Sequence, residues 1–386
     1  MHVQQGHYAD SVGFIRKPHV AMSMLLLPVV RCKPDLTRIF STGTESGPVV
    51  SKASRRVLLM VLAALSFIGC AREAFATSYS YTRVGNPQDI HTTTNTGTAM
   101  MGGGEDLDEA FGWLCARGNK GDFLVLRATG DGSYNAYVNG LCDMNSVATL
   151  VIPDRRAARE PAVARIIGEA EVVFISGGDQ ANYIRGWRGT PVEDAINAHI
   201  AAGKPLGGTS AGLAVLGEFI YGSLHDKPDE DDLSSREVLQ NPYADRVTLV
   251  RHFLKIPHLE GLLTDSHFVT RDRMGRTLGF LARIMQDGWA PFPREVAIDE
   301  RSAVLVEADG SAKIVGKGQG AYFLKPVRKA QVCAVNVPLT LRDVRVQRVA
   351  SGGQFDLTSW TGTGVNYVLS VNEGKVMTTQ PGGSIY

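Results

Sequence analysis

The sequence predicts an α/β fold in which helices cover both faces of a mostly parallel sheet. Short apolar runs alternate with amphipathic segments over residues 98–219, and Gly-rich turns follow several of these runs. From residue 296 the pattern changes to closely spaced β-type segments. Strands that are buried on both faces are continuously apolar, and their alternation with helices is typical of parallel sheets.

The expected elements follow in chain order. Residues 98–101 predict a short buried strand ending at Gly102-Gly103-Gly104, and residues 107–117 predict a helix. Further strands are expected at residues 122–127, 147–152 and 172–175, with a helix at residues 160–170. A helix at residues 192–202 precedes a brief strand at Leu206, and residues 211–219 are expected to be helical. Ligands bind at the carboxyl ends of the strands in such sheets, so the Gly-rich turns there indicate where a site should lie.

The second half of the chain is expected to extend this domain with antiparallel strands. Residues 297–299, 303–307, 313–315 and 320–324 alternate with turn residues. Residues 329–386 predict a small C-terminal β segment, either an appendage or an edge. The acidic stretch at residues 226–232 is expected to be a solvent-exposed loop. We therefore expect a main domain at residues 77–328 followed by the C-terminal segment.

Residues 51–76 have the pattern of a secretory signal peptide. Basic residues precede the apolar run 57–68, and Ala74-Phe75-Ala76 supplies the small residues for cleavage after Ala76. The run is too short to span a bilayer. A buried helix is the alternative, and a twin-arginine signal at Arg55-Arg56 and a lipoprotein site at Cys70 remain open variants. We expect a periplasmic or extracellular protein without a stable membrane span after processing, and an over-extended or disordered N-terminus at residues 1–50.

The composition excludes some partners. A formal net charge of +1 with 20% charged residues favours neither nucleic acid nor an anionic membrane surface. The mature chain would keep Cys115, Cys142 and Cys333, and export permits a Cys115–Cys142 disulfide, although three buried reduced cysteines fit equally well. No His/Cys spacing typical of a metal site is present, so no metal or cofactor is expected. A monomer and a homodimer are both left open.

The run Gly208-Thr209-Ser210-Ala211-Gly212 matches the G-x-S-x-G pattern of a nucleophile elbow. Such a turn between a strand and a helix holds the serine in a strained conformation, and the flanking glycines remove Cβ atoms that would clash. The helix N-terminus then directs N–H groups at a developing oxyanion. A Gly-rich turn with a helix-capping serine is the alternative to a nucleophile.

A nucleophilic serine needs a base, and His267 is the strongest candidate. It lies downstream of Ser210 in Thr264-Asp265-Ser266-His267-Phe268 and is followed by Arg271, Arg273 and Arg276. Arginines this close to a catalytic histidine favour a bidentate clamp on a substrate carboxylate, although they could also be surface charges. Arg127, at the end of a predicted strand, is a weaker candidate for the same role.

These motifs together resemble the cyanophycinase and dipeptidase E group of serine peptidases. The resemblance rests on residues 174–180 (FISGGDQ), residues 208–212 (GTSAG) and residues 265–268 (DSHF) with the three arginines, and it spans residues 98–325. It implies a flavodoxin-like fold, as in the class I glutamine amidotransferases, with serine in place of their cysteine. It also implies Ser210 as nucleophile, His267 as base and N–H groups of Gly178 and Ala211 as oxyanion donors. The substrate cleft or its support would contain Gln180, Asp265, Ser266, Arg271, Arg273 and Arg276.

The sequence departs from cyanophycinase in two places. Ser266 stands where cyanophycinase typically has glutamine, which changes the reach and the donors available to a substrate. The segment between Ser210 and His267 is longer, with the acidic loop as the insertion. In the family the third triad member is expected within this segment, so Asp226 is the first choice, followed by Glu218 and Asp229.

The sequence thus predicts an exported serine peptidase that cleaves peptide or isopeptide bonds next to an acidic residue, such as those of cyanophycin or β-aspartyl peptides. The reaction would pass through an acyl-enzyme on Ser210. Two alternatives remain: a serine amidase or esterase that acts on a small metabolite, and a non-catalytic binding protein with the same fold.

Overall fold

The computed structural model describes residues 78–227 and 230–386. The expected N-terminal segment 1–50 and the expected signal peptide 51–76 lie outside the described residues. Within the described part, no helix has the length and apolar character needed to cross a membrane.

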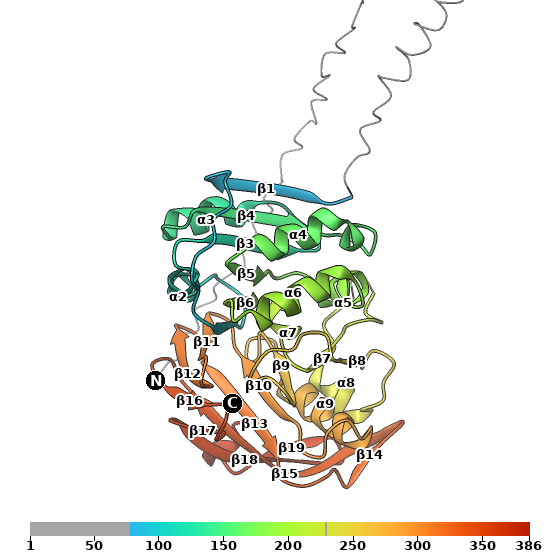
Figure 1. Cartoon of the computed structure of the whole chain (residues 1–386). Coiled ribbons are helices and arrows are strands. Elements are labelled where there is room, and N and C mark those ends of the chain that lie inside the picture. The colour runs from blue at the N-terminus through green and yellow to red at the C-terminus, as the bar shows by residue number, and fades with distance from the viewer. Residues whose placement is uncertain (1–77, 228–229) are drawn as a thin grey trace, which may run out of the picture. The chain divides into compact units, whose positions relative to one another are not determined.

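Two sheets organise the described chain, and the first contains ten strands among the described residues, in the order β1-β4-β3-β5-β6-β2-β11-β12-β16-β17 (Figure 1). Its parallel centre consists of β2 (Gly97–Met101), β3 (Asp122–Arg127), β4 (Ser146–Val151), β5 (Val172–Ile175) and β6 (Leu206–Thr209). Antiparallel strands flank this centre, namely β1 (Ser80–Gly85) on one edge and β11 (Ser302–Glu307), β12 (Ser311–Gly316), β16 (Gln354–Asp356) and β17 (Thr361–Gly362) on the other. The parallel centre is as predicted, and the strands expected at residues 303–307 and 313–315 lie in its antiparallel extension. The strands expected at residues 297–299 and 320–324 belong instead to a second sheet.

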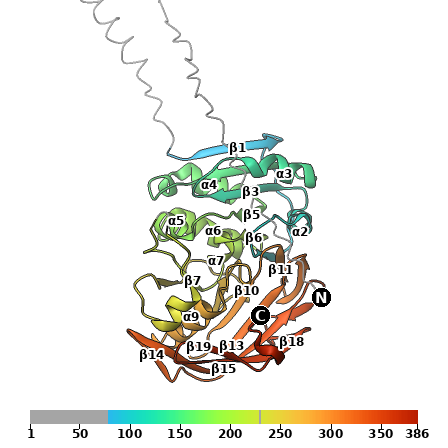
Figure 2. The ribbon, with the colours of Figure 1, turned by 180° about the vertical axis from the view of Figure 1, so that it is seen from behind.

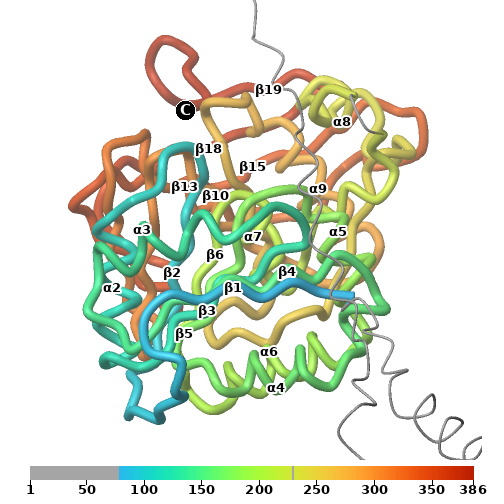
Figure 3. Tube along the Cα trace, turned by 90° about the horizontal axis from the view of Figure 1, so that it is seen from above, coloured from blue at the N-terminus to red at the C-terminus, as the bar shows by residue number. Residues whose placement is uncertain are grey.

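Helices cover both faces of the parallel centre. Successive strand residues face opposite sides of the sheet, so a continuously apolar strand presents apolar side chains to both faces. Leu124 and Leu126 pack in one core, while Phe123 and Val125 pack in another. The first core is covered by α4 (Pro161–Glu169), α5 (Gln180–Trp187) and α6 (Pro191–Ala201), and the second by α2 (Asp108–Gly118) and α3 (Ser133–Leu141). Figure 3 shows α4 and α6 on one side of the strands and α3 on the other. The continuous apolar runs seen in the sequence follow from this burial on both faces.

The second sheet follows the order β19-β18-β15-β13-β10-β9-β7-β8, with β14 paired to β15. Its strands are β7 (Phe219–Tyr221), β8 (Leu249–Arg251), β9 (Leu262–Asp265), β10 (Arg294–Ile298), β13 (Ala321–Pro326), β14 (Val332–Ala334), β15 (Val337–Val349), β18 (Val365–Asn372) and β19 (Lys375–Thr378). Strand β9 runs parallel to both β7 and β10. Helix α9 (Met274–Gln286) packs on this sheet and on α8 (Ser235–Gln240). The short 3-10 turns are η2 (Ala157–Arg159) and η3 (Pro381–Gly383).

Residues 329–386 contribute strands to both sheets. Strands β14, β15, β18 and β19 continue the second sheet beyond β13, whereas β16 and β17 continue the first beyond β12. Figure 2 shows β15 and β18 beside β13, on the side of the second sheet away from the parallel centre of the first. The C-terminal segment is therefore continuous with the sheets that carry the rest of the fold.

The helix expected at residues 211–219 is much shorter than predicted. Helix α7 spans only Ala211–Ala214, and residues 219–221 form strand β7 instead. The Gly217 N–H donates to Thr264 Oγ1 on β9 at 3.1 Å, which turns the chain toward the second sheet. Tertiary pairing with β9 has thus overridden the local apolar pattern.

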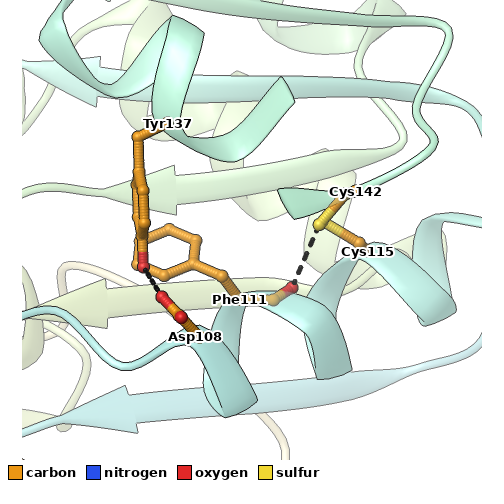
Figure 4. Close-up of a disulfide and its surroundings, with 5 residues drawn as sticks. All are labelled: Asp108, Phe111, Cys115, Tyr137 and Cys142. Atoms are coloured by element: carbon orange, nitrogen blue, oxygen red, sulfur yellow. Dashed lines mark hydrogen bonds between the residues drawn. A yellow bond between two sulfur atoms is a disulfide. The ribbon is translucent and has the colours of Figure 1, made fainter. Parts of the chain in front are cut away.

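Cys115 of α2 and Cys142, at the end of α3, form a disulfide. Figure 4 shows it beside Phe111, whose carbonyl oxygen lies 3.9 Å from the Cys142 sulfur. Tyr137 of α3 also reaches α2, since its hydroxyl donates to Asp108 at 2.7 Å. The expected pairing is present, and Cys333 is a buried free thiol.

Candidate active site

Ser210 stands on a strained turn between β6 and α7. Its backbone has φ 52° and ψ −115°, a positive-φ conformation that costs energy for a residue with a side chain. A Cβ at Gly212 would overlap the Ile175 carbonyl oxygen, and one at Gly208 would lie 2.6 Å from the Gly212 carbonyl oxygen. The tight packing explains why glycines flank the serine, as the elbow pattern requires.

The Ser210 hydroxyl lies 2.7 Å from Nε2 of His267, and Nδ1 of that ring lies 2.6 Å from Oε1 of Glu300. With the Nδ1–H tautomer, the ring donates to Glu300 and accepts a proton from Ser210. The three side chains thus have the connectivity of a Ser-His-acid triad. His267 follows β9 and Glu300 follows β10, so the contact depends on the parallel pairing of these strands.

The residues that follow β2 hold these groups in place. Consecutive carbonyl oxygens accept from the N–H groups of the site: Met101 from Ser210 at 3.2 Å, Gly102 from His267 at 2.8 Å and Gly103 from Arg301 at 3.0 Å. Gly103 has φ 94°, and a Cβ there would lie 2.6 Å from His267 Nε2. The Gly102-Gly103-Gly104 turn therefore supports three parts of the site that are distant in sequence.

Asp226, which we predicted as the third triad member, is held elsewhere. Its carboxylate accepts from the Tyr221 hydroxyl at 2.9 Å and from Arg246 at 3.0 Å. Glu218, the second choice, binds the Gly261 N–H at 2.6 Å, and Asp229 lies outside the described residues. The carboxylate beside His267 belongs to Glu300, which follows the histidine in the chain.

His267 is nearly buried, and its surroundings favour the neutral ring. Burial lowers the pKa of His267, and Arg271 and Arg273 act in the same direction, whereas the hydrogen bond to Glu300 raises it. The net pKa lies below the ordinary value of histidine. A neutral imidazole at physiological pH can accept the Ser210 proton, as a general base must.

Gly178 and Ala211, the predicted oxyanion donors, lie beside Ser210 in one cleft. Within the described residues, neither backbone N–H donates a hydrogen bond to another group. The loop before Gly178 is fixed by the buried Tyr183, whose hydroxyl donates to the Ser176 carbonyl oxygen at 2.8 Å. Asp179 caps α5 by accepting from the Ala181 N–H at 2.8 Å. Both amides thus lack an internal acceptor in the described part of the chain and belong to residues that line the cleft with Ser210.

A cleft of about 480 Å³ opens beside Ser210, between α5, the acidic segment and α9. Among the described residues, five basic and five acidic side chains line it: Arg185, Lys227, Arg271, Arg273, Arg276, Asp179, Asp226, Glu230, Asp232 and Asp265. A polar, charged lining of this kind suits a polar substrate rather than an apolar one.

Asp265 and two of the predicted arginines form a buried cluster in the wall of the cleft. Arg276 donates to both Asp265 oxygens, at 2.9 and 2.6 Å, and Arg273 donates to one of them at 3.2 Å. Burial alone would raise the pKa of Asp265, but the two guanidinium groups outweigh it and lower the net value. Asp265 and Arg276 are 4% and 2% exposed, so they support the cleft rather than present free groups to it.

Ser266 and Gln180 are also engaged within the protein. The buried Ser266 lies against Arg273, whose Nη1 donates to its carbonyl oxygen at 2.9 Å and its hydroxyl at 3.3 Å. Gln180, at the start of α5, donates to the Ser223 hydroxyl at 2.8 Å across the cleft. Arg271 is the most exposed of the three arginines, with 43% of its side chain accessible.

Arg127, the weaker clamp candidate, lies away from the cleft. Its guanidinium donates to the Thr129 carbonyl oxygen at 3.0 Å and to the Asp131 carbonyl oxygen at 3.2 Å. Because these contacts close the loop that follows β3, Arg127 stabilises its own turn. It is not among the residues that line the cleft.

Glu300 and its neighbour Asp299 were not predicted from the sequence as residues of the site. Asp299 accepts from the Val269 and Thr270 N–H groups, at 3.0 and 2.9 Å, and so fixes the segment that follows His267. Both carboxylates directly follow an apolar strand, as His267 does. That placement was the available signal, because parallel neighbouring strands bring their carboxyl ends together.

Comparison with known proteins finds similarity to the same group of enzymes that the motifs resemble. Residues 132–261 match the model of Peptidase family S51. Cyanophycinase from Synechococcus elongatus is 27% identical over 219 residues, which is 55% of this chain and 61% of that protein. Cyanophycinase from Geminocystis herdmanii is 23% identical over 269 residues, which is 66% of this chain and 88% of that protein. The chain therefore spans less than two thirds of the length of the Synechococcus relative.

Solved structures of peptidases are also similar. A peptidase from an acI-B1 Actinobacterium has a TM-score of 0.44 and 16% identity, covering 68% of this chain and 98% of that one. A putative peptidase E protein from Listeria monocytogenes has a TM-score of 0.38 and 15% identity, covering 57% and 98%. The sequence matches confirm the resemblance seen in the motifs: the chain is similar to cyanophycinases and, over residues 132–261, to Peptidase family S51.

Proposed function

We propose that this protein is a serine peptidase with Ser210 as nucleophile, His267 as general base and Glu300 as the residue that orients the histidine. The observation that carries the proposal is the continuous chain of contacts from the Ser210 hydroxyl through His267 to Glu300, at 2.7 and 2.6 Å. The match to Peptidase family S51 and the likeness to cyanophycinases support the same reaction class.

The reaction would proceed through an acyl-enzyme. Ser210 Oγ attacks the carbonyl carbon of the scissile bond while its proton passes to His267 Nε2. The N–H groups of Gly178 and Ala211 stabilise the resulting oxyanion, and the imidazolium then protonates the leaving amine as the C–N bond breaks. Water attacks the acyl ester, its proton passes to His267, and Ser210 Oγ leaves with that proton. The Glu300 carboxylate stabilises the imidazolium in both halves of the reaction.

We further propose that the substrate carries an acidic group near the scissile bond, as cyanophycin-like or β-aspartyl peptides do. Arg271 and Arg273 line the cleft that contains Ser210 and His267. Guanidinium groups bind carboxylates through charge-assisted hydrogen bonds of fixed geometry. The cyanophycinase names of the relatives favour this substrate class over an ester or a small amide.

A substrate panel tests this proposal directly. The protein from residue 77 onward would be assayed on cyanophycin, β-aspartyl dipeptides, α-aspartyl dipeptides and their asparagine counterparts. We expect cleavage of the acidic substrates and its loss in Ser210→Ala. A Ser133→Ala variant, which changes a serine outside the cleft, serves as the matched control. Equal activity of Ser210→Ala and the parent would contradict the mechanism, whereas cleavage of the asparagine peptides alone would contradict only the specificity.

We also propose that the protein is exported by a signal peptide at residues 51–76. The sequence pattern carries this proposal, and the Cys115–Cys142 disulfide supports it because such bonds persist in oxidising compartments. Expression of the full chain in a bacterial host, followed by fractionation and N-terminal sequencing, tests it. We expect mature protein outside the cytoplasm that begins at Thr77. Unprocessed protein retained in the cytoplasm would contradict it.

A further inference from the structure

Arg271 and Arg273, which line the cleft, both donate to one residue of the acidic stretch 226–232. Asp232 Oδ2 accepts from Arg273 Nη2 at 2.6 Å and from Arg271 Nη1 at 3.0 Å. The Arg273 Nη1 group is taken by Asp265 and Ser266, and Arg276 is taken by Asp265. The Asp232 carboxylate therefore bridges Arg271 and Arg273, as a bound carboxylate ligand would.

Asp232 differs from Asp265 in how firmly it is held. The Asp265 side chain is 6% exposed and receives contacts on both oxygens, whereas the Asp232 side chain is 52% exposed and receives its arginine contacts on one oxygen. Burial opposes ionisation of Asp232, but Arg273 and Arg271 hold its pKa well below the ordinary value. Asp232 is thus a charged carboxylate that meets both the arginines and the solvent. If a substrate carboxylate took the place of the Asp232 carboxylate on these arginines, the free energy lost with the Asp232 contacts would be small, since half-exposed ion pairs contribute little to stability.

The neighbouring acidic residues are anchored by a different arginine. Arg246 donates to Asp226 at 3.0 Å and to the Asp231 carbonyl oxygen at 2.6 Å, and it lies 3.6 Å from Glu230. These contacts do not involve Arg271 or Arg273. A rotation of the Asp232 side chain would therefore free both arginines while the Arg246 contacts persist.

We infer that Asp232 determines specificity as an internal competitor, and that an acidic substrate binds by replacing its carboxylate on Arg271 and Arg273. This inference rests on the proposed function insofar as the substrate is acidic. It makes the site selective, because a neutral group cannot replace the lost charge-assisted hydrogen bonds. A peptide without a carboxylate at this position would leave Asp232 on its arginines and gain nothing from them.

Binding in a catalytically inert background separates this inference from the proposed function. Calorimetry on Ser210→Ala would measure N-acetyl-aspartate amide, its neutral match N-acetyl-asparagine amide and N-acetyl-arginine amide, with and without Asp232→Asn. We expect Asp232→Asn to bind the aspartate compound about threefold to tenfold more tightly, because a competing anion is removed. Binding of the asparagine compound should be unchanged. Asp231→Asn, which removes the adjacent charge without touching the two arginines, is the matched control and should resemble the parent.

Several results would overturn the inference. Unchanged or weaker binding of the aspartate compound in Asp232→Asn would do so, as would an equal gain in Asp231→Asn, which would indicate a general charge effect. Weaker binding of the arginine compound in Asp232→Asn would show that Asp232 instead recognises a cation. None of these measurements requires turnover, so a protein that cleaves no peptide but shows the predicted gain would contradict the proposed function alone.

Discussion

His267 and Glu300 are 33 residues apart in the chain, yet Nδ1 of the histidine lies 2.6 Å from Oε1 of the glutamate. The contact forms because β9 and β10 are parallel neighbours, with Asp265 in register with Ala297, and each strand releases its functional side chain just beyond its carboxyl end. Ser210 reaches the same point from β6 of the first sheet. The site is therefore formed by residues that follow β6 of the first sheet and β9 and β10 of the second. The end of β2 and the turn that follows it are hydrogen-bonded to all three segments.

Glu300→Gln should lower kcat far more than Asp226→Asn does. The amide cannot stabilise the imidazolium and can favour the wrong ring tautomer, so we expect a loss of about a thousandfold or more. Asp226 contacts Tyr221 and Arg246 instead, so its variant should keep most of its activity. Steady-state kinetics on one peptide would compare kcat of the two variants. A larger loss of kcat in Asp226→Asn than in Glu300→Gln would indicate that Asp226 is the third member of the triad.

The acid limb of kcat/KM should lie below the ordinary histidine pKa of about 6.5. Burial and the nearby arginines lower the pKa of His267, so the ring stays neutral and able to accept a proton at more acidic pH. Removing the Glu300 carboxylate removes a contribution that raises this pKa, so the residual activity of Glu300→Gln should titrate at still lower pH. A pH–rate profile measures both values. An acid limb above the ordinary value, or an upward shift in the variant, would be inconsistent with this environment.

Gly103→Ala should reduce activity by about a hundredfold, because small displacements of a catalytic group are costly. The added methyl group would meet the His267 ring at a backbone φ of 94°. Gly112→Ala is the control, since a Cβ at that helical position meets no atom within 4 Å. Kinetics alongside thermal unfolding would distinguish a displaced histidine from an unfolded protein. Full activity in Gly103→Ala would show that the turn does not position His267.

Asp265→Asn should destabilise the protein by about 3–5 kcal/mol, because it leaves the buried Arg276 guanidinium without its anion and leaves Arg273 with Asp232 alone. Asp232→Asn removes a half-exposed partner of Arg271 and Arg273 and should cost about 1 kcal/mol or less. Urea unfolding monitored by circular dichroism would give both free energies of unfolding. Equal costs would indicate that Asp265 does not hold the cluster together.

The sequence was sufficient for the residues whose roles depend on local chain geometry. Ser210 lies in a turn that its own flanking glycines permit, and the strands around it were visible as apolar runs because both of their faces are buried. Glu300 could not be found in this way, since its function arises from the pairing of β9 with β10, and it lies outside the segment between Ser210 and His267 where the third triad member was expected. The prediction of Asp226 as the third triad member was wrong for the same reason, because it relied on chain position and not on strand pairing. The short α7 likewise reflects contact with Thr264 of β9, which no local pattern encodes.

Covalent labelling with a fluorophosphonate tests the central claim most directly. Intact-mass and peptide-mass spectrometry would be applied to the parent, Ser210→Ala, His267→Ala and Ser133→Ala proteins. We predict a single adduct on Ser210 in the parent and in Ser133→Ala, with none in Ser210→Ala and strongly slowed labelling in His267→Ala. An adduct on another residue, or labelling at the parental rate in His267→Ala, would contradict an activated Ser210.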